Sequence, residues 1–243
     1  RRILNRIVDN DVAENQIKEI KTVLEQEEGS WKEIFAPGIR VALFIGVVLA
    51  LLSQFSGINA IIYYGPKIFE SAGFGIDGAL NGQVIIGIVN VLFTVVAIFK
   101  IDSLGRRPLL IAGCIGMIIA HAIIGTLFFI GHTEGILLMI FIPFFIACFA
   151  FSYGPVIWTL LSEMYPTYVR GRAMSIATLS LWIGTYIIGQ LVPWMLEVLR
   201  PFGTFWLFAL TLLPAIWITW KLIPETKGKS LEEIEKYWLN ISK

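Results

Sequence analysis

Residues 41–64 read VALFIGVVLALLSQFSGINAIIYY and contain no Asp, Glu, Lys or Arg. A transmembrane helix needs about 20 predominantly apolar residues to cross the hydrocarbon core of a bilayer. This run is long enough. Because a helix satisfies its own backbone hydrogen bonds, it is one of the few structures that can cross that environment. We therefore predict a membrane-spanning helix here.

The rest of the chain repeats this pattern. Further apolar runs cover residues 81–99, 108–130, 135–161, 173–196 and 202–220. Of the 243 residues, 56% are hydrophobic and 15% are charged, and the mean hydropathy is +0.76. Soluble domains carry charge on about a quarter of their residues. The sequence therefore predicts an all-α membrane protein with six transmembrane helices and excludes an ordinary soluble domain.

Charged residues gather between these runs. Of the 37 charged residues, 31 lie in four segments: 1–40, 100–107, 163–172 and 221–243. If both ends of the chain are cytoplasmic, 17 of the 19 Lys and Arg residues lie inside, and only Lys67 and Arg200 lie outside. Because Lys and Arg in short loops set orientation, we predict a multi-pass plasma-membrane protein with both ends cytoplasmic. The net charge is only +1, so the chain does not create the positive electrostatic field that would attract nucleic acid.

The charge pattern also predicts three regions. Residues 1–38 form a cytoplasmic linker, residues 39–223 the six-helix bundle and residues 224–243 a cytoplasmic tail. Apolar residues recur at helical spacing in residues 3–8 and 17–24, which favours two short amphipathic helices over a solvated linker. The chain opens on Arg1 rather than Met, so we expect it to begin inside a longer protein.

Polar residues inside the first span point to a site. Gln54 and Asn59 are five positions apart and would diverge by about 140° on an ideal helix. A break at Gly57 would bring them together, and a second break is predicted at Gly154 and Pro155. Amides that both donate and accept suit neutral polyhydroxylated ligands.

Two further spans carry polar or small stripes. Gln83, Gly87, Asn90 and Thr94 share one helix face, as do Thr178, Trp182, Thr185 and Gly189. Such stripes line pathways or make ordinary helix contacts. Phe149 and Trp158 could offer apolar faces to a sugar ring or pack within the bundle or against lipid.

Six motifs in order carry a family resemblance. They are Gln54-Phe55-Ser56-Gly57-Ile58-Asn59 with Tyr63-Tyr64, Asp102-Ser103-Leu104-Gly105-Arg106-Arg107, Gly154-Pro155-Val156-Ile157-Trp158, Ser162-Glu163, Arg170-Gly171-Arg172 and Pro224-Glu225-Thr226-Lys227-Gly228. The chain resembles the sugar porter family of the major facilitator superfamily, and bacterial xylose and glucose transporters in particular. Members have twelve spans in two halves. The resemblance implies that this chain is the linker plus the C-terminal half.

The resemblance also implies roles for individual residues. Sugar hydroxyls would bond to Gln54, Asn59 and Asn90, and the ring would lie against Phe149, Trp158 and Trp182, with Tyr63 at the extracellular side of the site. Gly57, Tyr64, Gly154 and Pro155 would serve gating. Two departures from the family could alter specificity: Ser53 stands where a second Gln is usual, and Leu181 where many members have Gln or Asn.

Four charged residues at span ends form a candidate latch. The resemblance implies that Asp102, Arg106, Glu163 and Arg170 hold the cytoplasmic side closed and separate on opening. The alternative is that these charges only set topology, since surface ion pairs contribute about 0–1 kcal/mol each.

The expected function is transport of a monosaccharide such as xylose or glucose by alternating access. The expected partners are the sugar, the bilayer and the N-terminal six-helix half. Proton coupling stays open, because the family's coupling carboxylate lies in the first half. A sugar sensor with the same fold is the alternative. An enzyme is excluded, because the only histidines, His121 and His132, have no companion at ligand or catalytic spacing; no cofactor or metal is expected.

Overall fold

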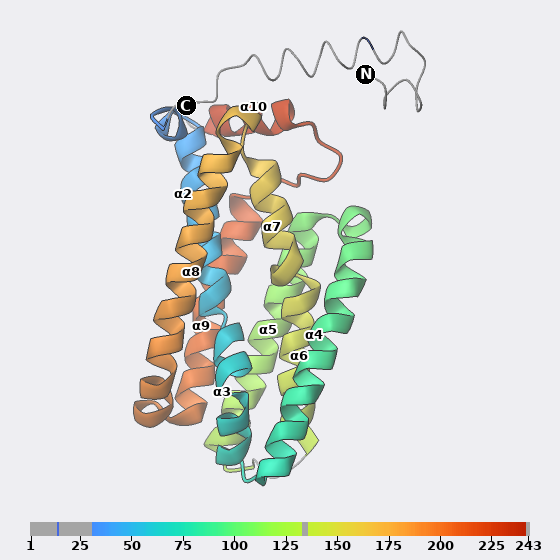
Figure 1. Ribbon diagram of the computed structural model, residues 1–243, viewed down its shortest axis with the longest axis vertical. Helices are drawn as coiled ribbons and strands as arrows, with labels where there is room; N and C mark the ends of the chain where they lie inside the picture. Colours follow the sequence, from blue (N-terminus) through green and yellow to red (C-terminus); the bar gives the residue numbers. More distant parts are fainter. Residues whose placement is uncertain (1–13, 15–30, 133–135, 242–243) are drawn as a thin grey trace.

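The computed structural model describes residue 14 and residues 31–132 and 136–241, and its regular elements are all helical (Figure 1). They are the short 3-10 turn η2 (Glu33–Phe35), then α2 (Ile39–Phe55), α3 (Ile58–Ser71), α4 (Ile76–Leu104), α5 (Arg106–Phe129), α6 (Ile136–Phe151), α7 (Tyr153–Met164), α8 (Thr167–Val198), α9 (Arg200–Lys221) and α10 (Leu231–Ile241). The two linker helices predicted before residue 31 lie outside the described residues.

The prediction of six membrane spans is confirmed. Within the described residues, six helical units are long and apolar enough to cross a membrane. Two of them are broken spans, Ile39–Ser71 made of α2 and α3, and Ile136–Met164 made of α6 and α7. Each unit contains nearly all of its predicted run and most extend beyond it, because polar residues at the ends of a run continue the helix.

The first span continues past its predicted end because Pro66 is accommodated inside α3. Proline has no N–H, so the carbonyl four residues earlier, that of Ile62, loses its helical partner. The side chain of Gln83 on α4 supplies one instead, since its Nε2 donates to the Ile62 carbonyl at 3.0 Å. A neighbouring helix thus satisfies the freed backbone group, as bilayer burial requires.

The core of the bundle surrounds α5, which packs most extensively on α9 and α6, while α2 packs on α8 (Figure 1). At its centre the fully buried His121 lies among the rings of Phe145, Phe205 and Phe208, with centroids 4.3, 5.7 and 5.6 Å away. The helix α4 is different, because only 17% of its most apolar window is buried, against 61% for the first span. Its apolar surface is available to lipid or to another protein.

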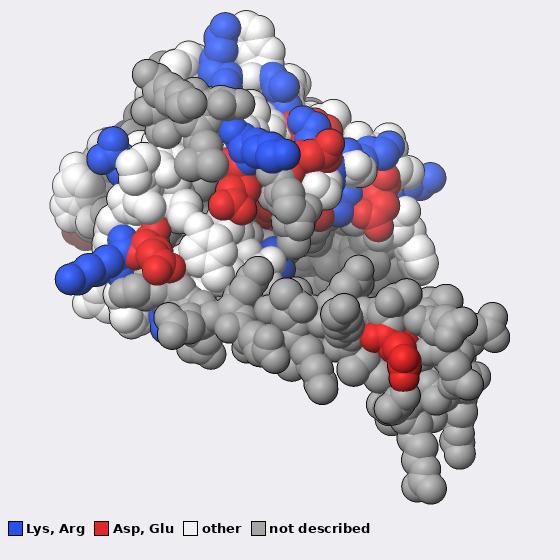
Figure 2. Space-filling model, turned by 90° about the horizontal axis from the view of Figure 1, so that it is seen from above, with Lys and Arg blue, Asp and Glu red and all other residues white. Residues whose placement is uncertain are grey.

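The charged residues of the described chain concentrate at one end of the bundle, which we call the α10 end. Here lie α10, η2, the α4–α5 turn and the α7–α8 turn (Figure 1). Figure 2 views the molecule from this end and shows Lys and Arg interspersed with Asp and Glu. At the opposite end the described Lys and Arg residues are Lys67 and Arg200.

Candidate functional site

The first span is interrupted at Gly57. Helix α2 ends at Phe55, and Gly57 adopts a left-handed backbone with φ of +85° before α3 begins. Two carbonyls freed by the break meet side chains of other helices. The Thr211 hydroxyl on α9 lies 2.7 Å from the Phe55 carbonyl, which shares the single hydrogen of that hydroxyl with the Phe208 carbonyl of α9 at 2.8 Å. His121 on α5 lies 2.8 Å from the Ser56 carbonyl. Since a carbonyl only accepts, the His121 Nε2 atom carries the proton.

The break brings Gln54 and Asn59 together, as its position in the sequence predicted. Asn59 Nδ2 donates to Gln54 Oε1 at 2.7 Å. The same oxygen accepts from Thr185 Oγ1 on α8 at 3.0 Å, and Gln54 Nε2 donates to Ser53 Oγ at 3.0 Å. We call Ser53, Gln54, Asn59 and Thr185 the amide cluster. It is neutral, it lies within the span, and it joins α2, α3 and α8.

The other predicted sugar-contact residues differ in their contacts and exposure. Asn90 on α4 accepts from Thr94 of its own helix at 3.5 Å, and no hydrogen bond joins it to the amide cluster among the described residues. Trp158 and Trp182 are 41% and 61% exposed, and Tyr63 is 54% exposed. Phe149 is half-buried, with its ring 6.5 Å from that of Tyr153. These aromatic faces are open to a ligand or to another domain.

Tyr64 behaves differently from its neighbour Tyr63. Its hydroxyl donates to the Gly189 carbonyl on α8 at 2.9 Å. This bond holds α3 against α8 beyond the amide cluster, toward the end opposite α10. The bond therefore links α3, the second part of the broken first span, to the continuous helix α8.

The second broken span divides two residues earlier than predicted. Helix α6 ends at Phe151 and α7 begins at Tyr153, so Gly154 and Pro155 lie in the first turn of α7 rather than at the break. The reason is that proline is tolerated in the first turn of a helix, where backbone N–H groups have no helical partner. Ser152 at the junction has φ of −125° and ψ of −86°.

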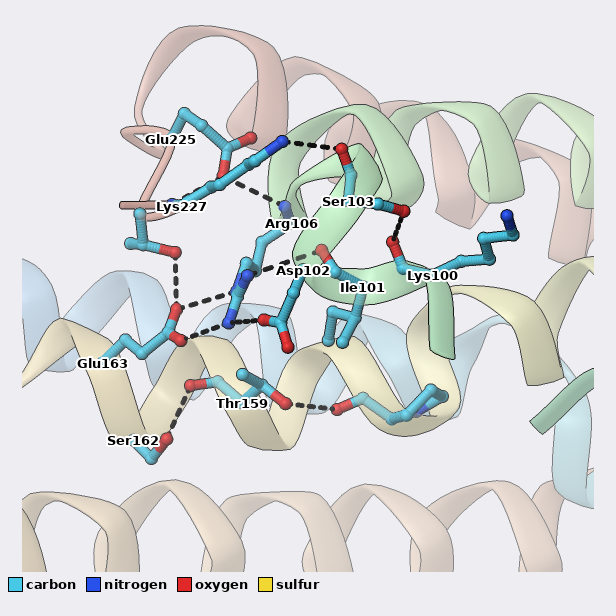
Figure 3. Close-up of polar contacts among 12 residues, drawn as sticks. Lys100, Ile101, Asp102, Ser103, Arg106, Thr159, Ser162, Glu163, Glu225 and Lys227 are labelled. Atoms are coloured by element: carbon cyan, nitrogen blue, oxygen red, sulfur yellow. Dashed lines mark hydrogen bonds and ion pairs between the residues drawn. The ribbon is translucent and has the colours of Figure 1, made fainter. Parts of the chain in front are cut away.

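At the α10 end, Arg106 and Glu163 form a two-bond ion pair (Figure 3). Arg106 Nε lies 3.1 Å from Glu163 Oε2, and a terminal nitrogen lies 2.7 Å from Oε1. That nitrogen also lies 2.8 Å from Asp102. The Arg106 side chain is only 9% exposed and that of Glu163 is 24% exposed, so this pair is better shielded from solvent than an ordinary surface pair. The pair joins α5 to α7, and Asp102 adds a contact with α4.

Arg170, the fourth predicted latch residue, lies apart from this ion pair. Its guanidinium donates to the Tyr165 carbonyl at 3.3 Å and to Thr167 Oγ1 at 3.4 Å. Tyr165 lies in the turn between α7 and α8, and Thr167 is the first residue of α8. Arg170 therefore stabilises that turn, and of the four predicted latch residues Asp102, Arg106 and Glu163 form the ionic cluster.

The chain segment after α9 joins the same cluster. Thr226 Oγ1 donates to Glu163 Oε2 at 2.6 Å, and Lys227 Nζ donates to the Ser103 carbonyl at 2.6 Å (Figure 3). Glu225 accepts from the backbone N–H groups of Arg106 and Arg107 at 3.0 and 3.1 Å. A carboxylate on the first two N–H groups of α5 caps that helix and complements its dipole.

Gly105 makes this cap possible. Its φ is +89°, and a Cβ there would lie 2.7 Å from a Glu225 carboxylate oxygen. Only glycine combines that backbone with so close an approach. The motifs Pro224-Glu225-Thr226 and Gly105-Arg106-Arg107 therefore meet in space although they lie far apart in the sequence.

Several of these residues escaped the sequence-based prediction. Thr185 was on a predicted stripe, and Glu225 and Thr226 were in a recognised motif, so each carried a signal without an assigned role. His121 and Thr211 carried none. Their hydrogen bonds run to backbone carbonyls of another helix, and no spacing in the sequence reveals such a pairing.

Comparison with known proteins places the chain among transporters. The family described as "Sugar (and other) transporter" matches residues 1–238. The arabinose-proton symporter of Bacillus subtilis is 43% identical over 239 residues, covering 98% of this chain and 52% of that protein. The D-xylose-proton symporter of Escherichia coli K12 is 37% identical over 242 residues, covering 97% of this chain and 49% of that protein.

A solved structure agrees with these relatives. The structure of the major facilitator superfamily proton:xylose symporter XylE bound to 6-bromo-6-deoxy-D-glucose superposes with a TM-score of 0.82 at 36% identity. The match covers 97% of this chain and 50% of that one. The chain thus spans about half the length of the curated relatives it matches.

Proposed function

Because this chain belongs to the sugar transporter family of the major facilitator superfamily, we propose that it forms the second half of a membrane protein that transports a monosaccharide by alternating access. The sugar would bind at mid-membrane, against the broken first span, and two six-helix halves would rock around it. The predicted family resemblance is confirmed by the comparisons, and members of this family are transporters rather than enzymes.

The amide cluster is the observation that carries this proposal. Its amide and hydroxyl groups both donate and accept hydrogen bonds, which matches the hydroxyl groups of a sugar. No charged side chain belongs to it. The relatives named for arabinose and xylose transport favour a pentose as the substrate, with a hexose such as glucose as the second candidate.

The exposed aromatic residues support pairing with a first half. Trp182 and Tyr186 lie on α8 beside Thr185 and are 61% and 69% exposed, and Trp158 on α7 is 41% exposed. Burial of such rings stabilises an interface, and their faces suit sugar rings. We propose that the first half covers this face and that the sugar lies between the two halves.

Proton coupling would require a carboxylate from the first half. In the described spans, Asp and Glu lie only near the ends, at positions 70, 77, 102, 163 and 197. The relatives named as symporters make proton coupling the expected mode. We propose that this half binds the sugar and that the first half carries the proton.

The ionic cluster supports a latch at the α10 end. Its two-bond ion pair joins helices from different parts of the bundle, and the segment after α9 adds Thr226 to the same carboxylate. All of these contacts lie within this half, so opening would break them only if α5 moves relative to α7 while the halves rock. We propose that the α10 end is the cytoplasmic end and that the cluster holds it closed.

The proposed site is tested by replacing its amides in the complete transporter. Gln54→Ala and Asn59→Ala each remove groups that pair with sugar hydroxyls, so the KM for uptake should rise about tenfold or more. The KM is measured from the uptake of labelled arabinose, xylose and glucose into proteoliposomes. Asn81→Ala is the matched control, because this exposed amide near the start of α4 lies outside the amide cluster and on the face of the helix opposite Asn90.

Two outcomes would contradict the proposal. Wild-type KM values in both amide variants would remove the site assignment. Sugar binding without uptake by the wild-type protein, measured by calorimetry beside the uptake assay, would instead favour a sensor with a transporter fold.

A further inference from the structure

Which atoms of the amide cluster donate and which accept hydrogen bonds follows from the contacts of Ser53. The Ser53 hydroxyl donates to the Ala50 carbonyl at 2.7 Å. A hydroxyl has one hydrogen, so the Ser53 oxygen can only accept from its other neighbour. That neighbour is the Gln54 side chain at 3.0 Å. Its atom facing Ser53 must therefore be the amide nitrogen, and the amide oxygen must face the opposite way.

The opposite side of the Gln54 amide meets two donors. Asn59 Nδ2 and Thr185 Oγ1 lie 2.7 and 3.0 Å from Gln54 Oε1. Both lone pairs of this oxygen are thereby occupied. The Leu181 carbonyl of α8 lies 3.1 Å from the same Thr185 hydroxyl. Because the Gln54 atom facing Thr185 is an oxygen, and two oxygens in contact need a hydrogen between them, the single hydrogen of Thr185 goes to Gln54 Oε1.

Close packing prevents the Gln54 side chain from adopting another orientation. Its side chain is only 6% exposed. On α8, Gly184 leaves the room that Gln54 occupies, since a Cβ at Gly184 would lie 3.2 Å from Gln54 Cβ. The absence of a side chain at Gly184 lets α8 approach α2 closely enough for Thr185 to reach the amide.

We propose that Ser53 and Thr185 are positioning residues that fix the direction of the Gln54 amide and thereby determine which sugar hydroxyls are recognised. With Gln54 Oε1 saturated, Gln54 can offer the sugar only its second N–H. Asn59 offers Oδ1 and its second N–H. Ser53 is 2% exposed, so it acts on the sugar through Gln54 rather than by contact.

This inference rests on the proposed function and specifies how its site selects a substrate. A directed N–H pairs with a hydroxyl that accepts, and a sugar lacking that hydroxyl leaves the N–H unpaired. If Gln54 could rotate, its oxygen could replace the nitrogen and the site would tolerate more than one hydroxyl arrangement. Selectivity, rather than transport rate, is the property that Ser53 and Thr185 should control.

Thr185→Val and Ser53→Ala in the complete transporter test the proposal. Each removes one anchor while keeping most of the side-chain volume. We expect the KM of the preferred sugar to rise roughly three- to tenfold, as for loss of one hydrogen bond, with little change in the maximal rate. Competition by monodeoxy analogues should also show a smaller difference between the sugar and the analogue that lacks the hydroxyl paired with Gln54.

Conservative variants and a matched control separate positioning from folding. Thr185→Ser and Ser53→Thr retain the hydroxyl and should restore KM and selectivity toward wild-type values. Ser180→Ala removes a hydroxyl from the same helix α8, where it bonds only to the Ile176 carbonyl among described residues, and should leave both unchanged. If Thr185→Val reduces folded yield, Thr185→Ala replaces it in the comparison with Thr185→Ser.

The outcomes distinguish this inference from the proposed function. If the wild-type protein transports the sugar and the Thr185→Val and Ser53→Ala variants keep its KM and its selectivity, only the positioning role is overturned. Equal losses in Thr185→Val and Thr185→Ser would also overturn it, since the hydroxyl would then be irrelevant. A wild-type protein that neither binds nor transports a monosaccharide would contradict both proposals.

Discussion

Gly57 is the single residue on which the geometry of the amide cluster most depends. Its left-handed backbone turns α2 into α3, and a Cβ there would lie 2.6 Å from a ring carbon of Phe208. Both the conformation and the space favour glycine. The relative placement of Gln54 and Asn59 therefore follows from the absence of a side chain at a neighbouring position.

Gly57→Ala should lower the stability of the folded transporter. The left-handed conformation alone costs an alanine about 1–2 kcal/mol, and the displaced Phe208 ring adds to this. The midpoint of thermal unfolding in detergent measures the effect. Gly78→Ala is the control, because a Cβ there meets Phe74 only at an ordinary 3.5 Å. Equal midpoints for the two variants would show that the break tolerates a side chain.

For single residues, prediction from the sequence found some contacts and missed others. Gln54 and Asn59 were predicted to converge because both flank a glycine in the same span. Thr185 and His121 were not assigned, since each bonds to a residue more than 60 positions away. Pairing across helices depends on how they pack, and one sequence read alone does not contain that information.

Helices α5 and α7 are held together at the α10 end by one carboxylate. Glu163 accepts two bonds from Arg106 and one from Thr226. The sequence predicted Arg106, Glu163 and Asp102 as members of a latch, and the structure brings these three together. It leaves Arg170 in the first turn of α8, because that guanidinium reaches backbone and hydroxyl oxygens nearer to it in the chain.

Glu163→Gln should loosen this connection between elements. Hydrogen bonds to charged groups contribute about 1.5–3 kcal/mol, so removing the charge should raise hydrogen exchange at the backbone amides of residues 101–107. Mass spectrometry measures that exchange. Lys100→Gln is the control, since it removes a charge from the same end without touching Glu163. Identical exchange in both variants would count against the latch.

The element boundaries show where a sequence-based prediction is reliable. All six spans were predicted from their apolar length, because crossing a bilayer sets a minimum that composition reveals. The ends were less accurate: α3 continues through Pro66 because Gln83 of another helix supplies the missing hydrogen bond. The helix α10 was not predicted within the tail, although α10 packs on α2 and α7.

For the whole molecule, the distribution of charge and of exposed apolar surface agree with a half-transporter in a bilayer. Lys and Arg lie interspersed with Asp and Glu at the α10 end (Figure 2). The helix α4 and the tryptophans on α7 and α8 present apolar surface outward. The orientation of this assembly in the membrane stays a prediction, based on the excess of Lys and Arg at the α10 end.

Single-cysteine labelling of intact cells should reveal that orientation. In a background with Cys114 and Cys148 replaced by alanine, Asp77→Cys should react with a membrane-impermeant maleimide. Lys229→Cys should react only after the membrane is permeabilised. Both positions are exposed, so burial does not confound the comparison. The reverse pattern would place both ends of the chain outside.

The cap on α5 also has a consequence for biosynthesis. Glu225 is made 119 residues after Arg106, whose N–H it accepts. At about 5–20 residues per second, α5 waits on the order of ten seconds for its cap after its own start has left the ribosome. During that interval the Glu225 carboxylate is not yet available to the N–H groups of Arg106 and Arg107. A segment synthesised after α9 therefore completes the beginning of a helix that was made 119 residues earlier.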